Sequence, residues 1–123
     1  DTRHTREDAG YKKYHGLNGH IITFLNDFQQ TGGLNADGST KARVRLRRCP
    51  GFNLMTETYA GHCREGLTYH CAITKRGGSL AFAINGKTVL EGTDPAPLEG
   101  GLIGLRTFRT HLWWDNIRVF SNE

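Results

Sequence analysis

Several features that define large classes of proteins are missing from this 123-residue chain. It has no run near the roughly 20 apolar residues that a membrane-spanning helix needs, so we expect no membrane association. The opening residues contain no apolar segment, so we expect no signal peptide within the chain. Apolar residues nowhere recur at helical spacing over successive turns, which argues against a helical fold.

Sequence signatures of several kinds of chemistry are also missing. There is no glycine-rich phosphate loop, no nucleophile elbow and no pair of carboxylates spaced as in a glycosidase. The two His-Cys pairs, at 62–63 and 70–71, are too far apart for the usual zinc spacing, and residues 35–39 lack the carboxylates of a calcium loop. The sequence therefore predicts neither a metal site nor a cofactor.

The charge of the chain limits the kinds of molecule expected as partners. Its cysteine content does not identify the cellular compartment. The chain has 16 basic and 12 acidic residues, which gives a net charge of +4, and its pI is near 9.2. This balance suits an acidic polymer, but the basic residues do not form the stripe typical of nucleic-acid-binding proteins, so we expect no nucleic-acid partner. The three cysteines allow one disulfide with a free thiol, or three free thiols. Cys71 lies among apolar residues, which predicts a buried thiol.

What the sequence does contain is alternation of apolar and polar residues, most regular between residues 42 and 48. Val44 and Leu46 fall on one side of an extended chain, and the arginines at 43, 45 and 47 fall on the other. The apolar side predicts packing in a core. The arginine side either binds an anionic ligand or is the solvated face of a strand, and the sequence leaves both interpretations open.

Similar segments recur along the chain, and the Asn85-Gly86 pair between two of them is the strongest hairpin signal. The pattern predicts about eight strands separated by glycine-rich turns. We place them at residues 18–26, 42–48, 52–56, 67–75, 79–84, 87–91, 102–107 and 112–120. Residues 1–17 are expected to form an arm or loop, and residues 18–123 one antiparallel β-sandwich.

Three parts of the chain together resemble one protein family. They are YHGLNGH at 14–20, RLRRCPGFNL at 45–54, and the group LAFAINGK at 80–87, GLIGLR at 101–106 and WDNI at 114–117. In order and spacing these segments resemble the bacterial YesU-like family, which are concanavalin A-like jelly-roll proteins encoded among genes for pectin and other polysaccharide use. The resemblance covers approximately residues 10–120 and indicates the fold more directly than the function.

The resemblance implies an all-β, antiparallel sandwich of the concanavalin A-like jelly-roll type, in a bacterial protein of the periplasm or the cell exterior rather than the cytoplasm. Jelly rolls of this kind commonly need about 200 residues. The chain therefore looks like the C-terminal part of such a domain, without its N-terminal strands. Because a sheet edge or core face would then stay open, we expect either a dimer or a second segment that supplies the missing strands.

The partner that the resemblance implies is an oligo- or polysaccharide, an acidic one by the charge balance, in the concave groove of the sandwich. A lyase acting on it would need a group that neutralises the uronate carboxylate, a base and an acid. Tyr14, His15 and His20 are the candidate acid and base. Arg109 or Arg45 is the candidate neutralising group, because a guanidinium fork matches a carboxylate. Each histidine can equally be a structural residue at the start of a strand.

Further side chains are candidates for holding the polysaccharide without taking part in a reaction. They are Arg45, Asn53, His70, Arg106 and Trp114. The period-two rule puts Trp113 on the side of Ile117 and Val119, so we expect Trp113 in the core and Trp114 free to stack on a sugar ring.

Three kinds of function stay open on the sequence. The first is an enzyme, a polysaccharide lyase or glycosidase, which predicts a histidine or tyrosine beside an arginine on the concave face. The second is a non-catalytic carbohydrate-binding or accessory module, which predicts an exposed aromatic platform without clustered ionisable groups. The third is a segment that completes a larger sandwich, which predicts a defined oligomeric state in solution.

Overall fold

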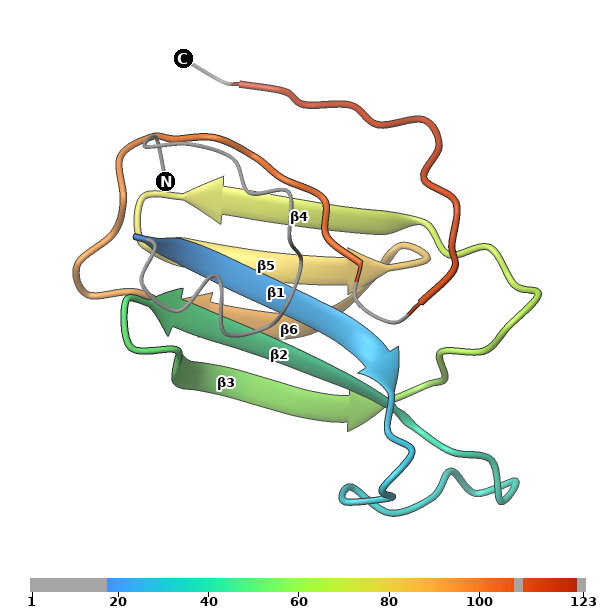
Figure 1. The fold of residues 1–123 in the computed structure, drawn as a ribbon. Coiled ribbons are helices and arrows are strands. Elements are labelled where there is room, and N and C mark those ends of the chain that lie inside the picture. The colour runs from blue at the N-terminus through green and yellow to red at the C-terminus, as the bar shows by residue number, and fades with distance from the viewer. Residues whose placement is uncertain (1–17, 108–109, 122–123) are drawn as a thin grey trace.

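The computed structural model describes residues 18–107 and 110–121. Within these ranges the regular secondary structure consists of β-strands, without a helix. One antiparallel sheet contains, in spatial order, β1 (Gly19–Asn26), β2 (Ala42–Cys49) and β3 (Asn53–Ala60). The second contains β4 (Cys71–Arg76), β5 (Ser79–Ile84) and β6 (Lys87–Thr93). Figure 1 shows the two sheets lying face to face. The predicted all-β, antiparallel, sandwich-like architecture is confirmed.

The hydrophobic core lies between the two sheets. Val44 and Leu46 of β2 face Leu80 and Phe82 of β5 and Leu90 of β6, and all five side chains are at most 6% exposed. Full burial of one such side chain contributes about 1.5–3 kcal/mol. Partly buried residues that pack against this cluster are Ile22, Phe24, Met55, Ile84 and Val89.

Gly92 of β6 lies close against the first sheet. A Cβ atom at this position would lie 2.9 Å from Leu46 Cδ2 and 3.3 Å from Thr56 Cγ2. Leu46 is 1% exposed and is surrounded by the core, so it has little room to move aside. The spacing of the two sheets therefore depends on the missing side chain of Gly92.

The register of the first sheet decides which residues share its outer face. Arg45 lies opposite Thr23 of β1 and Glu57 of β3, and Arg43 lies opposite Tyr59. Directly opposed residues of an antiparallel pair point to the same side. The residues between the arginines are buried, so the arginine side chains point away from the core. The alternation predicted for residues 42–48 is confirmed.

The turn between β5 and β6 and the loop before β4 together explain where β4 begins. Asn85 and Gly86 have φ values of 51° and 82°, as the predicted hairpin turn requires. Asn85 also bonds to the backbone of His70, donating to its carbonyl at 2.7 Å and accepting from its N–H at 2.8 Å. The Tyr69 hydroxyl lies 2.7 Å from His62 Nδ1 and accepts from the N–H of Arg64 at 3.0 Å. Loop contacts therefore hold the residues before Cys71, and the strand is shorter than the predicted 67–75.

The structure contradicts the prediction of two further strands at residues 102–107 and 112–120. Neither segment forms a strand, and Figure 1 shows both as coil. Alternation makes a segment able to form a strand, but the strand also needs a neighbour that satisfies its backbone groups. No described strand pairs with either segment. Trp113, expected in the core, is 88% exposed.

The cysteines are the other point of correction. All three, Cys49, Cys63 and Cys71, are free thiols, and Cys49 is the buried one. Cys71, predicted to be buried, is exposed. It belongs to β4, an edge strand whose six residues are all exposed. The expected arm or loop at residues 1–17 lies outside the described residues.

Candidate functional site

The outer face of the β1–β2–β3 sheet carries three arginines at alternate positions of β2. Arg43, Arg45 and Arg47 are half-buried. Neighbouring arginines are two positions apart, which is about 6.8 Å along the strand. Their surroundings differ, so each is described in turn.

Arg45, in the middle of the row, forms an ion pair. Its Nε donates to Glu57 Oε2 at 2.8 Å. Burial acts to lower the pKa of Arg45, but hydrogen bonding to Tyr59 and Glu57 outweighs it and raises the pKa. The guanidinium is therefore firmly charged and already has one carboxylate as a partner.

Arg47, at one end of the row, packs against the turn between β2 and β3. Its guanidinium carbon lies 4.2 Å from the centre of the Phe52 ring, which is a cation–π contact. One guanidinium nitrogen donates to the Phe52 carbonyl at 3.3 Å. Burial lowers the pKa of Arg47, and repulsion from Arg45 and Arg43 lowers it further.

Arg43, at the other end, has no counter-ion among the described residues. Its Nε is buried and finds no hydrogen-bond partner among the described residues. One other side chain of the described residues shares this property: Asp27, whose Oδ2 accepts from the Gly32 N–H at 2.9 Å while its Oδ1 is unpaired. A buried, unpaired donor on a charged group is costly, which makes Arg43 the natural position for an anion.

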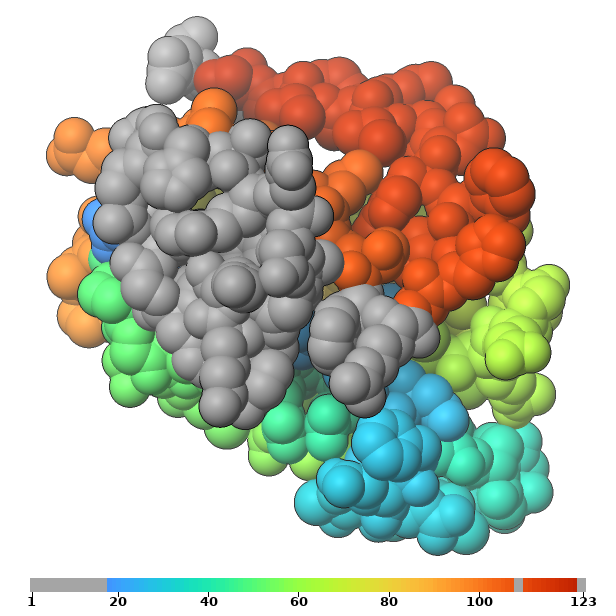
Figure 2. Space-filling view, viewed as in Figure 1, coloured from blue at the N-terminus to red at the C-terminus, as the bar shows by residue number. Residues whose placement is uncertain are grey.

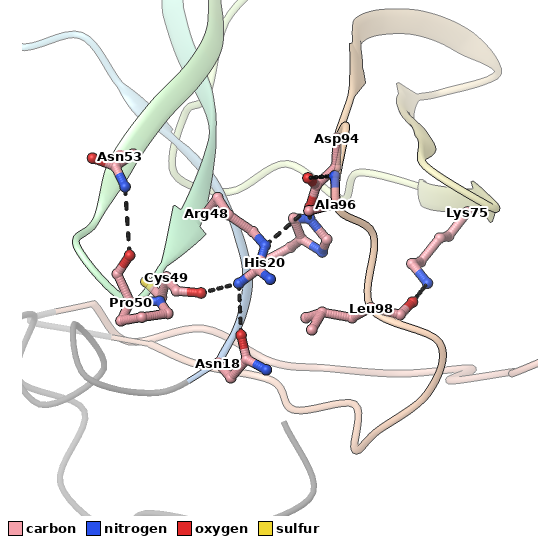
Figure 3. Close-up of polar contacts among 10 residues, drawn as sticks. All are labelled: Asn18, His20, Arg48, Cys49, Pro50, Asn53, Lys75, Asp94, Ala96 and Leu98. Atoms are coloured by element: carbon pink, nitrogen blue, oxygen red, sulfur yellow. Dashed lines mark hydrogen bonds and ion pairs between the residues drawn. The ribbon is translucent and has the colours of Figure 1, made fainter.

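A second polar cluster joins the two sheets at the other end of β2 (Figure 3). His20 Nε2 lies 2.7 Å from Asp94 Oδ2, and Arg48 Nε donates to the same oxygen at 2.9 Å. The other carboxylate oxygen, Oδ1, accepts from the Ala96 N–H at 2.8 Å. Arg48 also donates to the Asn18 side chain at 2.8 Å and to the Cys49 carbonyl.

This cluster, which we call the inter-sheet clamp (His20, Arg48 and Asp94), is well enclosed. The side chains are 10%, 22% and 5% exposed, respectively. The Ala96 N–H lowers the pKa of Asp94 most, and the hydrogen bonds from His20 and Arg48 lower it further against the opposing effect of burial. Because His20 and Arg48 come from the first sheet and Asp94 directly follows β6, the arrangement acts as a structural tie between the sheets.

A cavity of about 360 Å³ lies where the loops meet at one end of the first sheet. It is lined by Asn26, Thr40, Cys63, Arg64 and Glu65. Figure 2 shows the two contributing loops next to each other, and Asn35 joins them by donating to the Gly61 carbonyl at 2.8 Å. The lining is polar and the sequence did not predict it as a site.

The structure separates the residues proposed as a catalytic group. Tyr14, His15 and Arg109 lie outside the described residues. His20 belongs to the inter-sheet clamp, and its register partner is Arg48. Arg45 lies an odd number of positions from Arg48 in β2, so His20 and Arg45 are on opposite faces of the sheet.

The residues proposed to hold a polysaccharide are dispersed. Asn53 begins β3, and its amide donates to the Pro50 carbonyl at 3.4 Å. His70 is exposed and precedes β4, and Arg106 is half-buried in the coil after β6. Trp114 is 50% exposed. Of the proposed group, Arg45 is the residue that shares the outer face of β2 with the other arginines.

The sequence reasoning missed the partners that define both clusters. Glu57 and Tyr59 lie beyond the predicted end of their strand at residue 56, although extending the alternation would have placed them beside the arginines. His20 and Asp94 are 74 residues apart, and no local signal connects them.

Among the described residues, no group of three or more His, Cys, Asp or Glu side chains is placed to hold a metal ion. The described residues also include no helix long and apolar enough to cross a membrane.

Comparison with known proteins gives no relative. The chain matches no protein-family model, no curated protein and no solved structure. The resemblance to the YesU-like family therefore stays a prediction, and the function has to be argued from the residues themselves.

Proposed function

We propose that the protein binds an acidic polysaccharide along the outer face of the β1–β2–β3 sheet, through the arginines of β2. The observation that carries this proposal is the half-buried Arg43, whose Nε has no partner among the described residues. A sugar carboxylate would fill this position, because its two oxygens match the planar donor fork of a guanidinium.

The charge of the outer face supports an anionic ligand. Three arginines and the one carboxylate of Glu57 leave this face with a formal charge of +2 (three minus one). Burial lowers the pKa of Arg47 most, and repulsion from Arg45 and Arg43 lowers it further. An anion placed along the row would relieve that repulsion and replace the missing counter-charge.

Aromatic side chains at both ends of the row support a sugar as the carrier of the anion. Phe52 lies beside Arg47, and Tyr59 lies opposite Arg43 in the strand register. Aromatic rings present apolar faces on which sugar C–H groups pack. A chain that carries both carboxylates and apolar sugar faces fits this combination better than a simple anion.

The same proposal includes the finer description of the fold. Two face-to-face antiparallel sheets are compatible with a concanavalin A-like jelly roll, and jelly rolls commonly present one sheet face to a carbohydrate chain. We therefore propose the YesU-like resemblance and the polysaccharide ligand together.

A catalytic function, such as a lyase or glycosidase, is the second candidate because His20 lies 2.7 Å from a carboxylate. Three features favour binding over catalysis. Asp94 accepts hydrogen bonds on both oxygens. His20 is 10% exposed. The clamp and the arginine row are on opposite faces of the sheet, so one substrate cannot contact both.

The test is an isothermal titration calorimetry experiment in which polygalacturonate is added to the purified protein. Fully methyl-esterified pectin is the neutral comparison. We expect binding of the acidic polymer only. The variant Arg43→Gln should weaken the affinity about tenfold, because a charged hydrogen bond contributes about 1.5–3 kcal/mol. Arg76→Gln makes the same change of charge on exposed β4 and is the matched control, which should bind as the unaltered protein does.

Three results would count against the proposal. Equal affinity for both polymers would show that carboxylates are not recognised. Equal losses in Arg43→Gln and Arg76→Gln would indicate diffuse attraction between charges. A rise in ultraviolet absorbance during incubation with polygalacturonate, from the unsaturated product of elimination, would favour the lyase function instead.

A further inference from the structure

Residues 110–121, the last described part of the chain, expose a series of large apolar side chains. The exposed fraction is 88% for Trp113, 61% for Ile117, 67% for Val119 and 83% for Phe120. None of these twelve residues is buried, and Figure 2 shows the segment in red on the surface of the molecule. Several large, exposed apolar side chains on one short segment are typical of an interaction site.

The segment has the residue pattern of a strand although it lacks a partner. Trp113, Ile117 and Val119 are separated by even numbers of residues, so they share one side of an extended chain. β-Branched and aromatic residues are also those that strands favour. We call residues 112–120 the C-terminal segment.

The sandwich has a gap where such a strand would fit. Within the described residues, β1 pairs with β2 along one edge and has no strand along the other. Phe24 of β1 packs against Tyr69, just before β4, with ring centres 5.2 Å apart, and against Phe82 of β5 at 6.3 Å. β1 therefore lies over β5 and the beginning of β4, and Figure 1 shows β4 extending past the edge of β1.

The side chains of β4 show that this gap is uncovered. Ile73 lies opposite Phe82 in the strand register, so both point toward the other sheet. Phe82 is 4% exposed, whereas Ile73 is 60% exposed. The difference arises because the first sheet covers β5 but does not extend over β4. One more strand beside β1 would cover Ile73.

We propose that the C-terminal segment of a second copy of this chain forms a strand along the free edge of β1, above β4, and that the exchange is reciprocal. Among the described residues of one chain, neither the free edge of β1 nor the C-terminal segment has a strand partner. A two-fold axis makes each copy both donor and acceptor, which closes the assembly at two copies.

The area available is consistent with a stable dimer. Trp113, Ile117 and Val119, which share the side that would face β4, are 61–88% exposed and leave roughly 300 Å² open per chain, since an aromatic side chain presents about 150–250 Å² and an aliphatic one about half of that. Reciprocal exchange counts this area twice, and the surface of β1 and β4 that it covers adds a similar amount. The total is about 1,200 Å², at the lower end of the range of about 1,200–2,000 Å² that stable interfaces bury.

The experiment is sedimentation of the full chain over a hundredfold range of concentration, combined with amide hydrogen exchange. The variant Ile117→Lys puts a charge into the proposed interface, and Leu34→Lys makes the same change at a loop residue of comparable exposure, 45% against 61%. We expect a dimer whose dissociation constant rises at least tenfold in Ile117→Lys and is unchanged in Leu34→Lys. The amides of residues 112–120 should be protected in the dimer and not in the dissociated variant.

Each other outcome overturns the proposal. A monomer at all concentrations with unprotected C-terminal amides would show that the segment has no strand partner. A monomer with protected amides would show pairing within one chain. A dimer that Ile117→Lys does not weaken would place the interface elsewhere. Because both variants change residues that are exposed in the single chain, circular dichroism should confirm that they fold like the unaltered protein.

Discussion

The three arginines on the outer face of β2 are chemically identical, and their neighbours make them different. Arg45 has the carboxylate of Glu57, Arg47 has the ring and the carbonyl of Phe52, and the Nε of Arg43 has no partner among the described residues. A partly exposed ion pair such as that of Arg45 contributes about 1 kcal/mol or less, so it adds little to the stability of the sheet. At the residue scale, the difference between Arg43 and its two neighbours is the basis of the proposal that the row binds an anionic ligand.

The inter-sheet clamp should show the opposite behaviour, a large effect on stability. Asp94→Asn removes the charge that His20 and Arg48 share in an enclosed position. We expect the free energy of unfolding in urea at neutral pH to fall by about 2–3 kcal/mol, because Arg48 loses its counter-charge and His20 loses the carboxylate oxygen to which it is hydrogen-bonded. Glu91→Gln removes an exposed carboxylate from β6 and should change it by less than about 0.5 kcal/mol. Equal effects of the two changes would show that the clamp does not tie the sheets.

The stability contributed by the clamp should depend on pH in one direction. Because the pKa of Asp94 is lowered in the folded chain, the contribution is complete above the unfolded pKa of about 4 and is lost as the pH falls through the lowered value. The difference in unfolding free energy between the unaltered protein and Asp94→Asn should therefore shrink as the pH falls below about 4. A difference that is unchanged at the lowest pH would contradict this assignment.

At the scale of elements, the sequence predicts strands well where the alternation has a built-in partner. Residues 42–48 and 79–84 alternate regularly, and both form strands with buried apolar sides. The Asn85-Gly86 turn brings its two flanking strands together by itself. Residues 112–120 are also rich in residues that strands favour but form no strand, because pairing depends on a neighbour that the local sequence does not specify.

For the candidate site too, the sequence predicts which residues share a face of one strand but not which residues of the next strand lie beside them. Alternation alone placed Arg43, Arg45 and Arg47 on one face, and this was confirmed. The sequence could not show that Glu57 neutralises one of them, because that depends on the register between β2 and β3. The β-bulge after Leu46 shifts this register by one residue, so simple counting from the turn would have placed the wrong side chains beside the arginines.

The close approach of β6 to the first sheet gives a prediction at this scale. Gly92→Ala would place a Cβ atom 2.9 Å from Leu46 Cδ2, so we expect about 1–3 kcal/mol of destabilisation from overpacking. Gly104→Ala is the control, because nothing lies within 4 Å of a Cβ atom there, and it should leave the melting temperature nearly unchanged. If Gly92→Ala melts like the control, the two sheets are not held at the spacing described.

At the scale of the whole molecule, the two proposed interaction surfaces occupy different parts of the fold. The arginine row lies on the outer face of β2, the middle strand of its sheet. The uncovered part of β4 belongs to the second sheet and lies past the edge of the first sheet that β1 forms. Ligand binding and self-association can therefore be disrupted separately, and Ile117→Lys should leave the affinity for polygalacturonate unchanged.

The most direct measurement is nuclear magnetic resonance of the isotope-labelled protein titrated with short oligogalacturonates. If the outer face binds the acidic sugar, the largest shifts should occur at the side-chain Nε–H signals of Arg43, Arg45 and Arg47 and at the amides of the strands beside them. The signals of β4 should stay in place. Shifts centred instead on the loop cavity lined by Arg64 and Glu65, or on the inter-sheet clamp, would contradict the arginine face as the binding site.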